Sequence, residues 1–303
     1  MDQHISDAKL TLKKNGKSFY WAGKFLPSAY IDRASELYQF CRVLDDIADS
    51  GERGSLQTLK KIKSNFINYK ELKFKNNYNL KYPSFFNIYS KKAATHLIDG
   101  LILDQSTVLF KEEEELIQYS YYVAGTVGLM MCDALKCKNK EAYLFAIDLG
   151  IAMQLTNIAR DVLEDAKMGR RYIPGSWINN ISPNAMIQGV NDNNTEIFRT
   201  VSFGIKKLLN LAEKYYYSGT QGLIFLPLKT RIAISIASGV YRQIGIQLKL
   251  KNYCWYNGRQ VTSNITKAKV TFYRIIEEFI RNKNQKNHDP ELHKFLKEII
   301  VSE

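Results

Sequence analysis

The chain has 303 residues, of which 45% are apolar and 24% are charged, a composition that excludes a disordered chain and supplies a sizeable core. Lysine and arginine outnumber aspartate and glutamate by 43 to 30, which gives a formal net charge of +13. Such a charge attracts nucleic acid, anionic lipid or a polyanionic small substrate, or it simply reflects a solvated lysine-rich surface.

The sequence predicts an all-α fold, because it has only 6 prolines and 17 glycines and long stretches with helical periodicity. In chain order, helices are expected over residues 30–49, from residue 55, over residues 84–103, 112–135, 140–167, 196–217, 228–250 and 267–283, and from residue 290. Residues 1–14 are expected to be flexible, and residues 73–83 and 182–195 to be mostly loop. No repeat or low-complexity linker divides the chain, so residues 1–303 are predicted to form a single domain.

Several features bear on the location of the protein. Residues 1–17 contain no apolar run, so no signal peptide is expected. No window of about 20 residues is judged apolar enough to span a bilayer, the nearest candidate being residues 232–240. The cysteines are interpreted as free packing thiols in a reducing compartment, namely Cys41, Cys132, Cys137 and Cys254. We therefore expect a cytoplasmic protein that is soluble or peripherally attached to a membrane.

The first informative motif is an aspartate pair in the predicted helix over residues 30–49. Asp45 and Asp49 have i, i+4 spacing, which places both carboxylates on one helix face. Tyr38 and Arg42 extend the same stripe, and the planar fork of an arginine suits phosphate oxygens. This pattern indicates either a metal and phosphate site or a solvated charged face, and the segment alone does not decide between them.

A second stripe lies about 115 positions later, where Asn157, Asp161 and Asp165 follow i, i+4, i+8 with Gln154 one turn earlier. Its neighbours are apolar, and polar groups buried among apolar ones need a ligand, a metal or a partner. Together the two stripes predict hard divalent cations, Mg²⁺ above all, with a phosphate-bearing substrate completing the shell. The two helices must then face each other across a cavity.

Two weaker patterns also stand out. Gly125 and Gly128 interrupt a predicted helix, where glycine is destabilising, so they indicate close approach of another helix or of a lipid-like chain. Lys17 and Ser18 lie at the start of the first structured segment, where a helix N-terminus can hold phosphate.

At these positions the chain resembles the bacterial phytoene synthases, which belong with squalene and dehydrosqualene synthases, the head-to-head prenyl synthases. The resemblance rests on the Arg-x-x-Asp-Asp-x-x-Asp segment from Arg42, the run VAGTVGLMM over residues 123–131, and the string QLTNIARDVLEDAKMGRRYIP over residues 154–174. It covers about residues 15–269. It implies an isoprenoid-synthase-type helical bundle, a single squalene/phytoene synthase-like catalytic domain with a central cavity.

The resemblance also implies roles for individual residues. Metal ions, Mg²⁺ or Mn²⁺, are expected on Asp45, Asp49, Asn157, Asp161 and Asp165. The substrate diphosphate is expected on Lys17, Ser18, Arg42, Arg160 and Arg259, with Lys267 a further basic residue in the aligned region. The reaction site is expected to include Tyr38, Arg42, Tyr121, Gln154 and Tyr253. One departure is visible, because Asn15 stands where many relatives have histidine.

The function that this resemblance implies is 15-cis-phytoene synthesis, in which two geranylgeranyl diphosphates condense head to head through prephytoene diphosphate. The enzyme would be a prenyltransferase of carotenoid biosynthesis that needs no NADPH. The alternative within the fold is a presqualene diphosphate, squalene or dehydrosqualene synthase acting on farnesyl diphosphate. A nucleic-acid-binding protein is disfavoured, because the most ordered polar stripes are acidic rather than basic.

Overall fold

The computed structural model describes residues 3–50, 54–67, 80–281 and 287–300, and within these the chain is helical with a single isolated bridge, between Leu109 and Arg171. The all-α prediction is therefore confirmed. The α-helices are α1 (Gln3–Asn15), α2 (Lys17–Gly23), α3 (Ser28–Asp49), α4 (Ser55–Ile67), α5 (Ile88–Leu103), α6 (Glu113–Ser120), α7 (Thr126–Ala134), α8 (Ala142–Lys167), α9 (Pro183–Asn191), α10 (Thr195–Gln221), α11 (Leu228–Leu250) and α12 (Asn264–Ile280).

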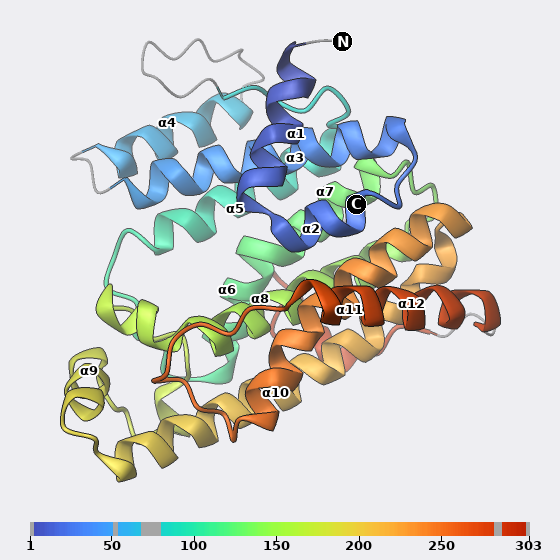
Figure 1. The fold of residues 1–303 in the computed structure, drawn as a ribbon. Helices are drawn as coiled ribbons and strands as arrows, with labels where there is room; N and C mark the ends of the chain where they lie inside the picture. Colours follow the sequence, from blue (N-terminus) through green and yellow to red (C-terminus); the bar gives the residue numbers. More distant parts are fainter. Residues whose placement is uncertain (1–2, 51–53, 68–79, 282–286, 301–303) are drawn as a thin grey trace.

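Helix α8 is the centre of the bundle (Figure 1). It packs against α7 and the turn before it, and against α10, α11 and α9. Helices α3, α4 and α5 form the blue to cyan layer of Figure 1, and α10, α11 and α12 form the orange to red layer. The N-terminal aspartate stripe lies on α3, in the first of these layers, and the second stripe lies on the central helix α8.

The helix α8 corrects one expectation about membranes. Among the described helices, α8 is long and apolar enough to cross a bilayer, whereas the sequence predicts no such segment, with residues 232–240 as the nearest candidate for a membrane span. Two thirds of its most apolar window is buried inside the protein, at 67%. Its apolar character is that of a helix contacted on most sides by other helices.

The predicted helix over residues 112–135 is interrupted in its middle. Between α6 and α7 lies a π-helical turn, Tyr121–Gly125, which inserts an extra residue and changes the face that the following residues present. Gly125 and Gly128 then face α8, and a Cβ on Gly128 would lie 2.1 Å from the carbonyl oxygen of Ala146. Close packing of α7 on α8 therefore accounts for Gly128.

This packing predicts a large effect from one methyl group. The clash at Gly128 is with backbone, which cannot rotate away, so Gly128→Ala should lower the free energy of unfolding by about 3 kcal/mol. Gly245→Ala on α11 is the control, because its Cβ would meet only the flexible side chain of Leu209 at 2.9 Å. Denaturant unfolding of both variants measures the difference, and equal stabilities would contradict the packing argument.

Two other expectations differ from the structure. Residues 182–195 were predicted to be mostly loop, but α9 forms there, with Ser182 accepting a hydrogen bond from the Ala185 backbone NH at 3.2 Å and Pro183 in the first turn. These are ordinary helix-start signals that the Asn and Asp residues further on obscured. The segment expected to be flexible contains α1, whose Ala8 and Leu12 are buried. The predicted loop over 73–83 lies mostly outside the described residues.

Candidate active site

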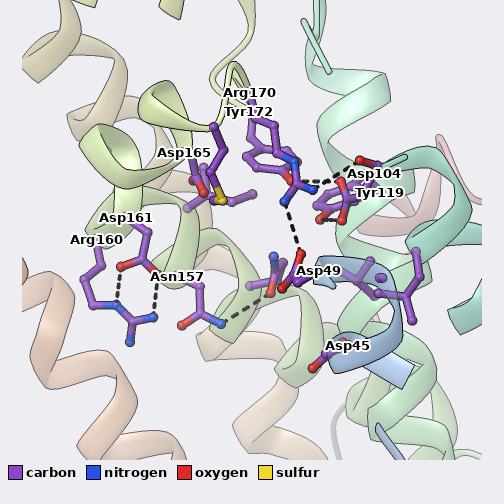
Figure 2. A pocket seen from close by; sticks show the side chains of 16 residues that line it. Asp45, Asp49, Asp104, Tyr119, Asn157, Arg160, Asp161, Asp165, Arg170 and Tyr172 are labelled. Atoms are coloured by element: carbon purple, nitrogen blue, oxygen red, sulfur yellow. Dashed lines mark hydrogen bonds and ion pairs between the residues drawn. The ribbon is translucent and has the colours of Figure 1, made fainter. Parts of the chain in front are cut away.

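Polar side chains from α3 and α8 face each other across a cleft of about 320 Å³ (Figure 2). The structure thus brings the two predicted aspartate stripes together. The cleft is lined by Asp45, Asp49, Asp104, Tyr119, Gln154, Asn157, Arg160, Asp161, Asp165, Arg170 and Tyr172. Carboxyl groups outnumber arginines in this space, so the cleft is rich in acidic side chains.

On the α3 side, Asp45 is the more enclosed of the two aspartates. Burial, only partly opposed by the nearby Arg42 and reinforced by Asp49, raises the pKa of Asp45 to about 7. Asp49 lies at the mouth, where its carboxylate is 3.7 Å from Arg170 Nη1. Asp45 is therefore only partly ionised at neutral pH, because the charge of Arg42 does not offset its burial.

On the α8 side, Asp165 is in the same condition. Burial raises the pKa of Asp165 to about 8, with the neighbouring charge of Asp161 adding to the effect. The amide nitrogen of Asn157 donates to Gln154 at 3.3 Å, but the Asn157 Oδ1 atom is buried without a hydrogen-bond partner. A buried oxygen without a partner is costly and is characteristic of a place that a ligand completes.

Asp161 is held differently, between two arginines. Arg160 donates to its two oxygens at 2.7 and 2.6 Å, and Arg259 donates to the same two oxygens at 2.6 and 2.9 Å. Arg259 comes from the segment before α12 and is half exposed. In this state the two guanidinium groups occupy the positions beside Asp161, so a metal ion or diphosphate would have to displace or share them.

Four further residues of the cleft were not assigned from the sequence. Asp104 accepts hydrogen bonds from the hydroxyls of Tyr119 at 2.7 Å and Tyr172 at 2.8 Å, and Arg170 Nη2 donates to the Asp104 backbone carbonyl at 3.2 Å. Burial raises the pKa of Asp104 despite these hydrogen bonds. Arg170 and Tyr172 are part of the string that carries the resemblance, so that signal was available, whereas nothing in the local sequence marks Asp104.

A larger apolar cavity, about 500 Å³, adjoins the cleft. Both spaces are lined by Asp45, Val123, Gln154, Asn157 and Arg160. The remaining wall is mostly apolar and includes Phe19, Val127, Met131, Leu149, Met153, Leu223 and Ile234. A polar, anionic cleft therefore joins a hydrophobic chamber directly, which suits a molecule with a charged head and a long apolar tail.

Three polar side chains stand at the chamber end of this junction. Tyr38 and Arg42 line the chamber as the stripe on α3 predicted, and Tyr241, which was not predicted, stacks on Phe19 at 4.9 Å between ring centroids. Burial raises the pKa of Tyr241, so its hydroxyl stays protonated at neutral pH and can donate a hydrogen bond. Arg42 forms an ion pair with Asp46, which lies outside the cleft.

The structure does not bring every predicted residue to this site. Tyr121 is fully buried in the core, where its hydroxyl lies 3.2 Å from His96 Nδ1, and it does not line the chamber. Tyr253 lines a separate cavity near Arg242, beyond the end of α11. Lys17 and Ser18 line neither the cleft nor the chamber. Lys17 does lie near Lys267, whose pKa is lowered mainly by burial and further by the positive charge of Lys17.

A separate polar cluster anchors the C-terminal segment to α8. Asp148 is fully buried and accepts hydrogen bonds from Ser218 at 2.5 Å, His288 at 2.8 Å and His293 at 2.7 Å. Among the described residues, Asp148 and the two histidines are the only group of potential metal ligands gathered within 4.8 Å. It lines neither the cleft nor the chamber, and direct hydrogen bonds join its members.

Loss of this anchor should release the C-terminal segment. Asp148→Asn removes the negative charge and one of the two acceptor oxygens, so one of the two histidines loses its acceptor, and we expect it to cost about 3 kcal/mol and to expose residues 287–293 to proteases. Burial would raise the pKa of Asp148, but its histidine hydrogen bonds outweigh this and lower it. Its stabilising contribution is therefore present above the ordinary aspartate pKa and is lost as pH falls through the lowered value. Asp192→Asn, at an exposed site after α9, is the control.

Comparison with known proteins identifies the family. The family model for squalene/phytoene synthase matches residues 12–273. The chain belongs to the squalene/phytoene synthase family. Among members of the family, the 15-cis-phytoene synthase of Pantoea ananas is 30% identical over 272 residues, covering 86% of this chain and 87% of that protein. The phytoene synthase of Pseudescherichia vulneris is also 30% identical, over 278 residues, with the same coverage of each chain.

The fold agrees with this assignment. The crystal structure of a dehydrosqualene synthase in complex with ligand superposes with a TM-score of 0.74, at 24% identity, over 90% of this chain and 95% of that one. This likeness supports the predicted isoprenoid-synthase type of bundle but does not decide the substrate. As a squalene/phytoene synthase family member, the protein is a transferase of the prenyltransferase type, as the sequence predicted.

Proposed function

We propose that this protein is a 15-cis-phytoene synthase that condenses two molecules of geranylgeranyl diphosphate and releases both diphosphates. Relatives named phytoene synthase, 30% identical over most of both chains, support the choice within the family. The observation that carries the proposal is the junction itself, where an aspartate-rich cleft opens into a chamber of about 500 Å³ with a mostly apolar wall.

Divalent cations fit the cleft. The partnerless Oδ1 of Asn157 and the raised pKa values of Asp45 and Asp165 indicate oxygen ligands that lack a positive partner. Carboxylate and amide oxygens are the ligands that Mg²⁺ prefers, and Mn²⁺ accepts the same set. We propose that the cations are held by Asp45, Asp49, Asn157, Asp161 and Asp165. When bound, they would neutralise diphosphate charge as Lewis acids.

The chain's own residues bind the diphosphate and exclude water from the reaction. Arg42, Arg160 and Arg259 are placed to donate hydrogen bonds to diphosphate oxygens, with the Tyr241 hydroxyl as a neutral donor. Allylic C–O ionisation leaves a carbocation that the double bond of the second substrate attacks, and proton loss gives the cyclopropyl diphosphate prephytoene diphosphate. A second ionisation, ring rearrangement and a further proton loss give the central triene. The apolar chamber wall excludes water, which would otherwise trap the cations as alcohols.

Incubation of the purified protein with geranylgeranyl diphosphate and Mg²⁺, without NADPH, tests the proposal. A forty-carbon conjugated triene in the hexane extract, identified by mass and absorbance, is the expected product. Formation of only a thirty-carbon product from farnesyl diphosphate would instead assign the squalene or dehydrosqualene reaction. The same incubation with Mn²⁺ in place of Mg²⁺ compares the two cations.

The long apolar product also suggests where the enzyme works. We propose that the protein associates peripherally with a membrane surface, into which a forty-carbon hydrocarbon can pass. The net charge of +13 favours an anionic surface.

A further inference from the structure

Helix α12 carries most of its apolar side chains on its outward face, and only Val270 and Ile275 pack inward, against a small apolar cluster that includes Ile236 and Val240. Ile265, Phe272, Tyr273, Ile276, Phe279 and Ile280 are all exposed, by 42% to 77%. The residues of α12 that are buried are Lys267, Thr271 and Glu278, all polar. A surface helix normally does the opposite, with its apolar stripe facing the core.

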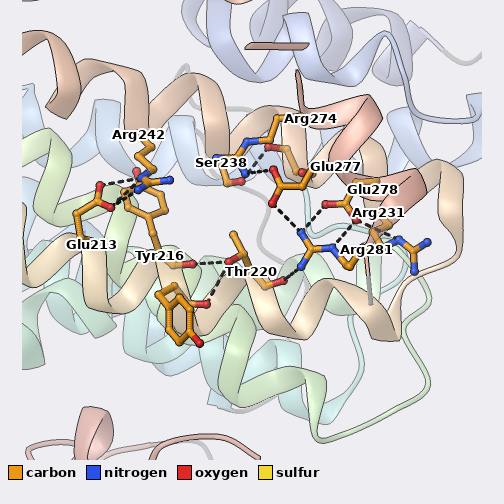
Figure 3. A network of polar contacts seen from close by, with 12 residues as sticks. Glu213, Tyr216, Thr220, Arg231, Ser238, Arg242, Arg274, Glu277, Glu278 and Arg281 are labelled. Carbon is orange, nitrogen blue, oxygen red and sulfur yellow. Dashed lines mark hydrogen bonds and ion pairs between the residues drawn. The ribbon is translucent and has the colours of Figure 1, made fainter. Parts of the chain in front are cut away.

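The inward polar face is fixed by an ion-pair network (Figure 3). Arg281 donates two hydrogen bonds to Glu278, at 2.8 and 2.6 Å, and Arg231 Nε of α11 lies 3.3 Å from the same carboxylate. Arg281 also donates to the backbone carbonyl of Thr220 on α10 at 3.1 Å. The Glu278 side chain is fully buried, so rotating α12 to bury the apolar stripe would separate Glu278 from Arg231 and Arg281 from the Thr220 carbonyl.

The packing of α12 on α11 is also close. Arg274 lies over Gly239, where a Cβ would come within 2.6 Å of its Nε atom. Arg274 in turn donates to Glu277 at 2.6 Å. The outward direction of the apolar stripe is therefore set by the fold, and the stripe needs a partner outside the described part of the chain.

The charges around the stripe indicate what that partner is. Lys269 is exposed on α12. On the adjacent α2, Trp21 donates from Nε1 to Thr271 at 3.0 Å, and the ammonium of Lys24 lies 5.3 Å from the centre of the Trp21 ring. Aromatic rings and lysines around an apolar helix face are the arrangement found at membrane interfaces.

A second copy of the chain fits the stripe less well. Each chain has a formal net charge of +13, so two copies meeting face to face would repel each other, whereas an anionic bilayer attracts both the lysines and the chain. The position also suits the chemistry, because α11, on which α12 packs, supplies Ile234 and Tyr241 to the chamber wall, and α2, which contacts α12 through Trp21, supplies Phe19.

We propose that the outer face of α12, with Trp21 and Lys24 of α2 beside it, is the surface by which the protein docks on an anionic lipid bilayer. Docked in this way, α12 lies in the plane of the interface with Phe272, Ile276 and Phe279 among the acyl chains. This inference rests on the membrane association proposed above and names its surface, but it does not depend on which prenyl diphosphate is used.

Vesicle sedimentation tests the surface. The wild-type chain should bind vesicles of phosphatidylcholine and phosphatidylglycerol, and bind them more weakly at high salt or without phosphatidylglycerol. The double variant Phe272→Ser/Phe279→Ser should lower the partition coefficient about tenfold or more. Its circular dichroism, and its turnover of substrate dispersed in detergent, should stay unchanged, because neither residue lines the cleft or the chamber.

The matched control is Phe203→Ser/Tyr217→Ser on α10, which removes two aromatic side chains of similar exposure, 53% and 63%. It should bind vesicles like the wild type. Equal loss in both double variants, or none in the α12 variant, would overturn the assignment of the surface. A wild-type dimer that the α12 variant converts to a monomer would replace the bilayer with a second copy. Failure of phytoene synthesis with intact vesicle binding would overturn only the proposed reaction.

Discussion

Replacing Asp161 by asparagine is expected to lower turnover with geranylgeranyl diphosphate about 10³-fold, equivalent to about 4 kcal/mol of transition-state stabilisation. Asp161 lies at the centre of the α8 stripe, between Asn157 and Asp165, and both of its oxygens accept charge-assisted hydrogen bonds. An amide has one oxygen and no negative charge, so the variant loses a proposed metal ligand and the partner of Arg160 and Arg259.

The control for this variant is Glu164→Gln, which makes the same chemical change on the same helix at a side chain that lines neither the cleft nor the chamber. It should retain turnover within a factor of about two. Circular dichroism should show that both variants have the same helix content as the wild type. Near-native activity of Asp161→Asn, with its fold intact, would contradict the proposed metal site.

The second large effect expected is a fall in Mg²⁺ affinity of about 10²-fold between pH 8.5 and pH 6.5. Burial is the main cause that raises the pKa of Asp45 to about 7 and that of Asp165 to about 8. Both carboxyls are therefore largely protonated at the lower pH, and each must lose its proton before it can bind a cation. Titration calorimetry in buffers of different ionisation enthalpy should detect close to two protons released per binding event near pH 6.5.

Asp165→Asn provides the internal check, since it should reduce proton release by about one and flatten the pH dependence accordingly. In the metal-free protein the raised pKa values make folding stability fall as pH rises, whereas Mg²⁺ affinity rises with pH. The contribution of both carboxyls to stability is full below the ordinary aspartate pKa and is lost as pH rises through about 7 and 8. A pH-independent Mg²⁺ affinity would show that these carboxyls are not the ligands.

Much of the site could be predicted because its signals are local. The i, i+4 spacing of Asp45 with Asp49, and of Asp161 with Asp165, depends only on helix geometry, and the structure places both stripes on one cleft. The helical class followed from periodicity for the same reason. The π-helical turn at Tyr121–Gly125 has no such signal, and Tyr121, which it contains, is buried in the core and does not line the chamber.

The sequence by itself determined that the chain is helical and predicted that two aspartate stripes bind divalent cations, because both inferences follow from residue type and helical spacing. Tertiary structure alone decided that Asp104 and Tyr241 join the site while Tyr253 does not, because these contacts link segments far apart in the chain. It also decided the direction of α12. Periodicity alone predicts that the apolar face of α12 packs inward, but the ion pair of the buried Glu278 with Arg231 of α11 fixes this face outward, since breaking a buried ion pair is strongly destabilising.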